Sequence, residues 1–183
     1  MSKKKFAIPA YITAEEIKTI RKSINLTQSE FAELMGCSKA TEVRWEASKE
    51  PITGPIVCAV YAIKHNHGFR EKIVLPEMKY RLRLSYMYKN ELCTIIDVDE
   101  INDRVEILNF IDNVFFRAFG SNANPTYQDY LEFIEARCFP RTRDKLKLVL
   151  QDLNIPFYDP IMIIEKTQGR MAEDDFWIDL ERK

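Results

Sequence analysis

The chain has 183 residues, of which 46% are hydrophobic and 30% charged, and its formal net charge is −1. This composition is typical of a folded globular protein and excludes an intrinsically disordered chain. No apolar run approaches the ~18 residues that a membrane-spanning helix needs, and the first ten residues lack the apolar core of a signal peptide. We therefore expect a cytoplasmic protein with no membrane partner.

The charges are divided unevenly along the chain. Residues 1–75 contain 12 Lys and Arg against 8 Asp and Glu, whereas residues 76–183 contain 15 against 20. At Pro76 the spacing of apolar residues also changes from the helical period to the strand period. We therefore predict an α+β protein of two domains. Residues 1–75 would form an all-α helix-turn-helix domain, and residues 76–183 a small α+β domain with an antiparallel β-meander and three helices.

The first two helices are predicted from their apolar spacing and their starts. Isoleucines recur at helical spacing over residues 12–24, and Thr13 with Glu16 has the pattern of a capping box. Thr27 and Glu30 repeat that pattern three residues apart. Each pair satisfies backbone N–H groups that a helix start leaves without partners, so each pair marks a helix start.

Two further helices follow in the amino-terminal part. Gly36 suits the left-handed position that ends a helix, and Ser38 is a good N-cap for a third helix over residues 39–47. Pro55 fits the first turn of a fourth helix, which we expect to fray over residues 65–68.

Residues 26–46, LTQSEFAELMGCSKATEVRWE, have the helix and turn lengths of a helix-turn-helix. Ala32 is small where two helices would cross, and Trp45 is a bulky anchor. The strings LTQSEFAELMG, SKAT and RWE, followed by PITGP, resemble the XRE (lambda-repressor-like) helix-turn-helix family over about residues 10–68. Within that family the chain is most similar to the DNA-binding half of MqsA-type antitoxins, although it lacks the zinc-binding cysteine unit of MqsA.

This resemblance implies that the third helix enters the major groove of double-stranded DNA, which is wide enough for one helix. Arg44 can fork onto a guanine edge, Lys39 can serve a base or a phosphate, and short polar side chains near helix starts suit phosphates. The competing interpretation is that Lys39 and Arg44 are ordinary solvated charges. The residues predicted to contact DNA are Thr27, Gln28, Ser38, Lys39, Ala40, Thr41, Val43 and Arg44.

Position 42 departs from the usual pattern, because an apolar residue normally packs inward there and this chain has Glu42. A buried, unpaired carboxylate lowers the stability of the fold by roughly several kcal/mol. The third helix could be rotated so that Glu42 reaches solvent, Glu42 could pair with Arg21 or Lys22, or the helix could be strained. We expect pairing or partial exposure.

The second domain begins with strand patterns. Apolar residues alternate over residues 80–88, with one apolar face, and Lys89-Asn90 has the pattern of a hairpin turn into residues 92–98. Residues 104–110 form a third predicted strand, and residues 114–119 a candidate fourth. These strands would make the meander.

Helices follow the strands. Apolar spacing predicts a helix from Tyr127 to near Cys138, a second that begins at Thr142, and a third that begins at Pro160 and stops at Gly169. The last segment, residues 176–180, is predicted as a strand.

Arginines and acids cluster near the end of the chain. We predict a site for an anion or a partner at Arg141, Arg143 and Arg170, and Glu173 to Asp175 could bind a divalent metal. The alternative, which the sequence favours, is that these arginines and acids pair with each other and lock a small fold. Residues 135–180 also loosely resemble accessory segments of toxin–antitoxin operons, including HipA-type proteins, but this likeness implies no function.

No cofactor, metal site or catalytic residue is predicted. The four cysteines have no CxxC spacing and no nearby histidine at ligand spacing, so we expect reduced and mostly buried thiols. His65 and His67 have no acid or thiol beside them and are expected to be solvated. A Ser-His-Asp set and a Gly-rich phosphate loop are both missing, which favours a binding module over an enzyme.

The sequence therefore predicts a sequence-specific, DNA-binding transcriptional regulator that acts as a homodimer. The resemblance implies the autorepressor and antitoxin of a toxin–antitoxin operon, with a cognate toxin as a second partner. One alternative is a prophage or mobile-element repressor whose second domain senses a signal or dimerises. Others are an enzyme with a DNA-targeting amino-terminal domain and an interaction scaffold with a degenerate helix-turn-helix.

Overall fold

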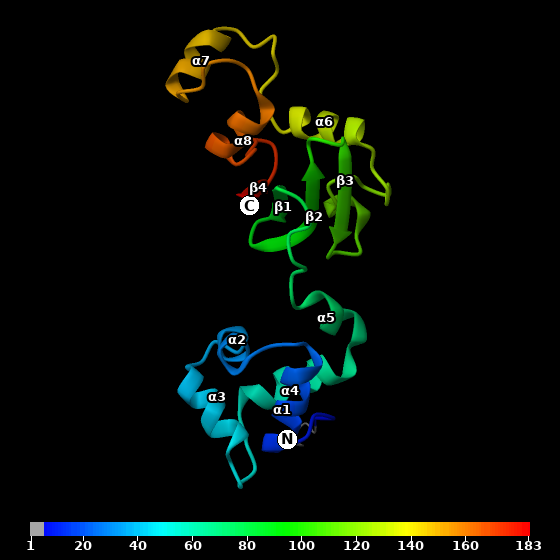
Figure 1. Ribbon diagram of the computed structural model, residues 1–183, viewed down its shortest axis with the longest axis vertical. Helices are drawn as coiled ribbons and strands as arrows, with labels where there is room; N and C mark the ends of the chain where they lie inside the picture. Colours follow the sequence, from blue (N-terminus) through cyan, green and yellow to red (C-terminus); the bar gives the residue numbers. More distant parts are fainter. Residues whose placement is uncertain (1–5) are drawn as a thin grey trace, which may run out of the picture. The chain divides into compact units, whose positions relative to one another are not determined.

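The computed structural model describes residues 6–183, which form a mixed α+β protein with eight α-helices and one four-stranded antiparallel sheet (Figure 1). This confirms the predicted α+β class. The chain divides into two compact units, Met1–Pro76 and Glu77–Lys183. We call them unit 1 and unit 2.

Unit 1 is helical in its described part. Its helices are α1 (Ala14–Ser23), α2 (Gln28–Leu34), α3 (Lys39–Glu46), α4 (Pro55–His65) and α5 (His67–Lys72).

Both predicted capping boxes are present. Thr13 accepts a hydrogen bond from the backbone N–H of Glu16 at 3.3 Å, and the Glu16 carboxylate accepts one from the backbone N–H of Thr13 at 3.0 Å. Thr27 and Glu30 repeat the arrangement at α2. Local side-chain chemistry therefore fixes where α1 and α2 begin.

The predicted fraying after α4 is wrong. Asn66 instead caps the short helix α5, because its side-chain oxygen accepts a hydrogen bond from the backbone N–H of Phe69 at 2.9 Å. A polar residue that ends one helix can thus begin the next.

The core of unit 1 combines α1, α2 and α4. Ile12 and Ile52, which flank these helices, exchange two backbone hydrogen bonds of 2.9 Å and tie the segment before α1 to the segment after α3. The buried apolar side chains of this core are those of Ile12, Ile17, Ile20, Ile24, Phe31, Ile52, Ile56, Val57, Val60 and Ile63.

Unit 2 contains the sheet. Its strands are β1 (Leu82–Tyr88), β2 (Glu91–Asp99), β3 (Arg104–Asn109) and β4 (Phe176–Arg182), in the spatial order β3-β2-β1-β4. The first three strands form the predicted meander, and Lys89-Asn90 makes the predicted hairpin turn. The predicted final strand is also confirmed, and it pairs antiparallel with β1.

The candidate strand at residues 114–119 is wrong. Val114–Phe116 is a short 3-10 helix, because the side chain of Asn113 accepts a hydrogen bond from the backbone N–H of Phe115 and tightens the turn. The Phe115 side chain is exposed, so an apolar run here does not indicate a buried strand.

The three predicted helices of unit 2 are α6 (Tyr127–Ala136), α7 (Leu146–Asp152) and α8 (Pro160–Thr167). The predicted start of α7 at Thr142 is wrong. Lys145 has a left-handed backbone conformation with φ of 56°, which a right-handed helix cannot contain. Helix α7 therefore begins at the next residue, Leu146.

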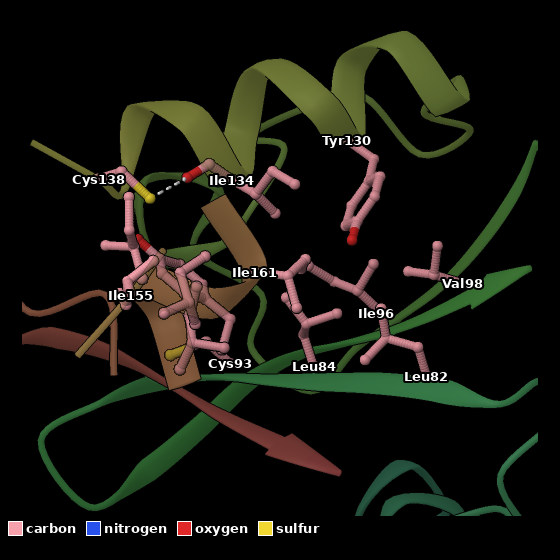
Figure 2. Packing of buried hydrophobic residues seen from close by; sticks show 14 of the residues in the cluster. Leu82, Leu84, Cys93, Ile96, Val98, Tyr130, Ile134, Cys138, Ile155 and Ile161 are labelled. Carbon is pink, nitrogen blue, oxygen red and sulfur yellow. Dashed lines mark hydrogen bonds between the residues drawn. The ribbon is translucent and has the colours of Figure 1, made fainter. Parts of the chain in front are cut away.

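One face of the sheet carries the core of unit 2. Figure 2 shows Tyr130 and Ile134 of α6 pointing toward Leu84 and Ile96 of the sheet. The Cys138 thiol donates a hydrogen bond of 3.2 Å to the carbonyl of Ile134. Helix α8 contacts both α6 and β4, so the two helices cover this face.

The opposite face of β1 is less simple than the predicted alternation of apolar and polar residues. The alternation over residues 80–88 places Arg83 on the polar side of the strand, yet it is buried. Its guanidinium donates two hydrogen bonds to Asp97 on the neighbouring strand, at 2.6 and 2.7 Å. The two residues are register partners, so a paired charge replaces an apolar contact at this position.

Candidate nucleic-acid interface

Helix α3 is anchored on one side and open on the other. It packs against α1 and α2, while Ser38, Lys39, Ala40, Val43 and Arg44 are exposed. Five of the eight residues predicted to contact DNA therefore lie on one continuous exposed surface at and beyond the start of the helix.

The two cationic residues of this surface are not engaged by the protein itself. Within residues 6–183, neither Lys39 nor Arg44 forms an ion pair or a side-chain hydrogen bond. Val43 between them is 42% exposed. The outer side of α3 thus presents two cations and one small apolar side chain to solvent.

Ser38 and the three remaining predicted residues, Thr27, Gln28 and Thr41, are partly occupied by helix capping or by internal contacts. Ser38 caps α3 by accepting a hydrogen bond from the backbone N–H of Thr41, and the two hydroxyls lie 3.0 Å apart. Thr27 caps α2 and is exposed. The Gln28 amide donates a hydrogen bond of 2.8 Å to Glu46, so this side chain supports α3 from within unit 1.

Glu42 is completely buried on the inner side of α3, with 0% of its side chain exposed. The expected partial exposure is therefore wrong, and the expected pairing with Arg21 is confirmed at 3.6 Å from Arg21 Nε to Glu42 Oε1. Neither carboxylate oxygen of Glu42 accepts a hydrogen bond from the described part of the chain. The ion pair is thus long and incomplete.

Arg21 gives its closer contacts to Glu46, one helical turn beyond Glu42. Its Nε and Nη2 donate hydrogen bonds of 2.7 and 3.1 Å to the two Glu46 oxygens, and its Nη1 donates one of 2.8 Å to the carbonyl of Leu26. With Gln28, this network joins α1, α2 and α3 and fixes the back of α3. Two carboxyl groups therefore share one guanidinium.

The two carboxyl groups respond to this site in opposite ways. Burial, followed by the neighbouring Glu46 carboxylate, raises the pKa of Glu42 to about 7, although Arg21 lowers it. Burial also opposes ionisation of Glu46, but hydrogen bonds from Arg21 and Gln28 outweigh it and lower the pKa of that group. The shared guanidinium therefore favours an ionised Glu46 and a protonated Glu42 near neutral pH.

The three arginines predicted as a partner site in unit 2 differ in their surroundings. Arg141 pairs with Glu135 at 2.7 Å. Arg143 and Arg170 have no acidic partner among the described residues, and both line one cavity that Arg141 does not line. The structure therefore brings two of the three together.

A buried arginine that was not predicted as a site residue holds the end of unit 2. Arg137 donates hydrogen bonds to the Asp174 carboxylate, to the carbonyl of Gly169 and to that of Phe176. The predicted pairing of the acids at residues 173–175 with Arg141, Arg143 or Arg170 is therefore wrong, because Asp174 pairs with Arg137 and Asp175 with Lys89. Charge clustering in the sequence marks the region, but the inward turn of one arginine among several has no sequence signal.

Other candidate ligands do not converge. Among residues 6–183, no three His, Cys, Asp or Glu side chains are close enough to hold a metal ion. All four cysteines are free, and the prediction of mostly buried thiols holds for Cys93 and Cys138, whereas Cys37 is half-buried and Cys58 exposed.

Within the same described range, no helix combines the length and the apolar character that crossing a bilayer requires. Comparisons with known proteins give no assignment, because neither a protein-family model nor a curated protein matches the chain.

Proposed function

We propose that this protein is a sequence-specific DNA-binding transcriptional regulator, with α2 and α3 acting as a helix-turn-helix. The two helices have seven and eight residues and are separated by four, among which Gly36 has a positive φ of 64°. Such short helices joined by a tight, glycine-containing turn are typical of the motif. The resemblance to the XRE family points the same way.

The observation that carries this proposal is the unpaired state of Lys39 and Arg44 on the open side of an anchored helix. An α-helix with its side chains is about 10–12 Å in diameter, and the major groove of B-DNA is about 12 Å wide. An exposed helix with free cations near its start can enter that groove without first breaking contacts inside the protein.

Each exposed residue then has a role set by its chemistry. Arg44 forks onto the O6 and N7 atoms of a guanine, Lys39 contacts a base or a phosphate, and Val43 meets a thymine methyl group. Ser38 and Thr27, at helix starts, contact phosphates. Gln28 acts indirectly, because its amide is used to hold Glu46.

A homodimer on a palindromic site follows from energetics. One helix-turn-helix module buries too little surface for high affinity, and two copies related by a two-fold axis read two half-sites. Unit 2 would supply dimer contacts or hold a second protein. The role of autorepressor and antitoxin, with a cognate toxin bound to unit 2, rests on the likeness to MqsA-type antitoxins alone.

A second candidate is a repressor whose unit 2 senses a signal. The observation in its favour is the cavity lined by Arg143 and Arg170, since a ligand site in the second unit is what a sensing domain needs.

Arg44→Ala is the first test of DNA binding. Binding sites selected from a random DNA library by the full chain would be measured by fluorescence anisotropy. Loss of one bidentate contact is expected to cost about 1–3 kcal/mol and to relax sequence preference at one base pair. Arg81→Ala, an exposed arginine of unit 2, is the matched control and should bind as the unchanged chain does. Failure to enrich any sequence, or equal affinities for both variants, would contradict the proposal.

A further inference from the structure

A cavity of about 510 Å³ lies in unit 2, between the end of α6, helices α7 and α8, and the loop at residues 170–173. Its volume is within the range of about 300–1,000 Å³ of small-molecule sites. Its apolar lining comes from several elements, chiefly Phe139, Val149, Leu153, Ile163 and Met171. The cavity can therefore hold an apolar body of two or more side chains.

One wall of the cavity is formed by Arg137, which is held in place by hydrogen bonds. The Arg137 side chain lines it, but its guanidinium is buried and already bonded to Asp174 and to two backbone carbonyls. Arg137 therefore shapes the site and is not available to a ligand.

The other charged residues of the lining have no ionic partner. Arg143, Arg170, Asp152 and Glu173 line the cavity, and within residues 6–183 none of them forms an ion pair. Two charges of each sign thus share one cavity without neutralising each other at contact distance.

The two arginines are partly pre-oriented. The guanidinium carbon of Arg143 lies 5.5 Å from the ring centre of Phe139, and that of Arg170 lies 4.9 Å from the ring centre of Trp177. Arg170 also donates a hydrogen bond from Nε to Gln168. Contact with a ring face leaves the edge of a guanidinium free, and that edge matches a carboxylate.

We propose that this cavity binds a short apolar peptide with free amino and carboxyl ends. The carboxylate pairs with Arg143 and Arg170, the ammonium group pairs with Asp152 and Glu173, and the side chains cover the apolar lining. All four charged side chains are exposed to solvent and are hydrated when the cavity is empty, but a simple anion would meet two acids and a simple cation two arginines. A ligand with both charges and an apolar body complements the whole lining.

Leucyl-phenylalanine is a suitable probe, titrated into the full chain and followed by isothermal titration calorimetry. The free dipeptide is expected to bind, and its N-acetylated and C-amidated forms are each expected to bind about tenfold more weakly, since each loses charge-assisted hydrogen bonds. DNA is absent from this experiment, so its result is independent of the proposed regulatory function.

Paired substitutions assign each end of the ligand. Arg143→Gln with Arg170→Gln should abolish the preference for the free carboxylate and keep the preference for the free amine, whereas Asp152→Asn with Glu173→Gln should do the reverse. Arg141→Gln, which alters an arginine outside the cavity, should change neither. Val149→Trp should block binding by filling the space.

The proposal is overturned if the free dipeptide shows no binding at millimolar concentration. It is equally overturned if the blocked dipeptides bind as well as the free one, or if the Arg141→Gln variant loses as much affinity as the variant with both cavity arginines replaced. Retention of native circular dichroism by each variant excludes unfolding as the cause.

Discussion

Glu42→Gln is expected to stabilise unit 1 by about 1–3 kcal/mol at pH 8, because it removes an incompletely paired charge from a fully buried position. The amide keeps the shape of the carboxyl group without its charge. Glu42→Val is expected to stabilise the unit as well, since an apolar residue is usual at this position of the motif. Fluorescence of Trp45 on α3, in a Trp177→Phe background, would report the unfolding of unit 1 in urea.

The stability of unit 1 is also expected to depend on pH through Glu42. The pKa of Glu42 is raised from an ordinary value of 4.5 to about 7 in the folded chain, so the folded state holds its proton where the unfolded state has lost it. The free energy of unfolding should therefore fall as pH rises from about 4.5 to about 7 and should then level off. The lowered pKa of Glu46 adds a separate loss of stability in acid.

In Glu42→Gln the decrease between pH 4.5 and 7 should disappear while the loss in acid remains. Glu33→Gln, a change at an exposed position of α2, is the control and should leave both the stability and its pH profile close to those of the unchanged chain. A Glu42→Gln chain that is less stable at pH 8, or that keeps the unchanged pH profile, would show that the carboxylate is properly satisfied.

Arg137→Met is expected to destabilise unit 2 by about 2–4 kcal/mol, because it removes a buried guanidinium and its hydrogen bonds, although the Asp174 side chain is 31% exposed and can be hydrated. The substitution strands the Asp174 carboxylate and the carbonyls of Gly169 and Phe176. Arg137→Lys should recover little, because an ammonium group cannot reproduce the planar set of donors. Amide hydrogen exchange of residues 169–182 in the full chain measures the loss locally.

Arg141→Met serves as the control for Arg137→Met. Its exposed pair with Glu135 should contribute little to stability, because water screens it. Equal effects of the two substitutions, or unchanged exchange in residues 169–182 of Arg137→Met, would contradict the structural role assigned to Arg137.

Features that depend on a few neighbouring residues were predicted well. The boxes at Thr13 and Thr27, the N-cap at Ser38 and the start of α4 at Pro55 are all confirmed, because each is a contact within one helical turn. The helix start at Asn66 was not predicted, because the helix that it caps, α5, has no buried apolar residues that would mark it in the sequence.

Features that depend on distant residues were predicted poorly. Arg83 finds Asp97 only through the register of β1 and β2, and Arg137 finds Asp174 across 37 residues. In unit 1 the sequence marked Glu42 as anomalous and named Arg21 as a partner, yet the preference of Arg21 for Glu46 depends on how three helices pack. The assignment of Lys39 and Arg44 to DNA stays a prediction.

The central claim, that the open side of α3 enters a DNA groove, is tested most directly by the salt dependence of binding. The affinity of the full chain for its selected DNA would be measured at several salt concentrations, for the unchanged chain and for Lys39→Ala with Arg44→Ala. We predict that the logarithm of the affinity falls linearly with the logarithm of the salt concentration, and that the double variant has a shallower slope and little sequence preference. A DNA affinity that does not change with salt concentration would contradict the account. So would a double variant whose salt slope and sequence preference equal those of the unchanged chain.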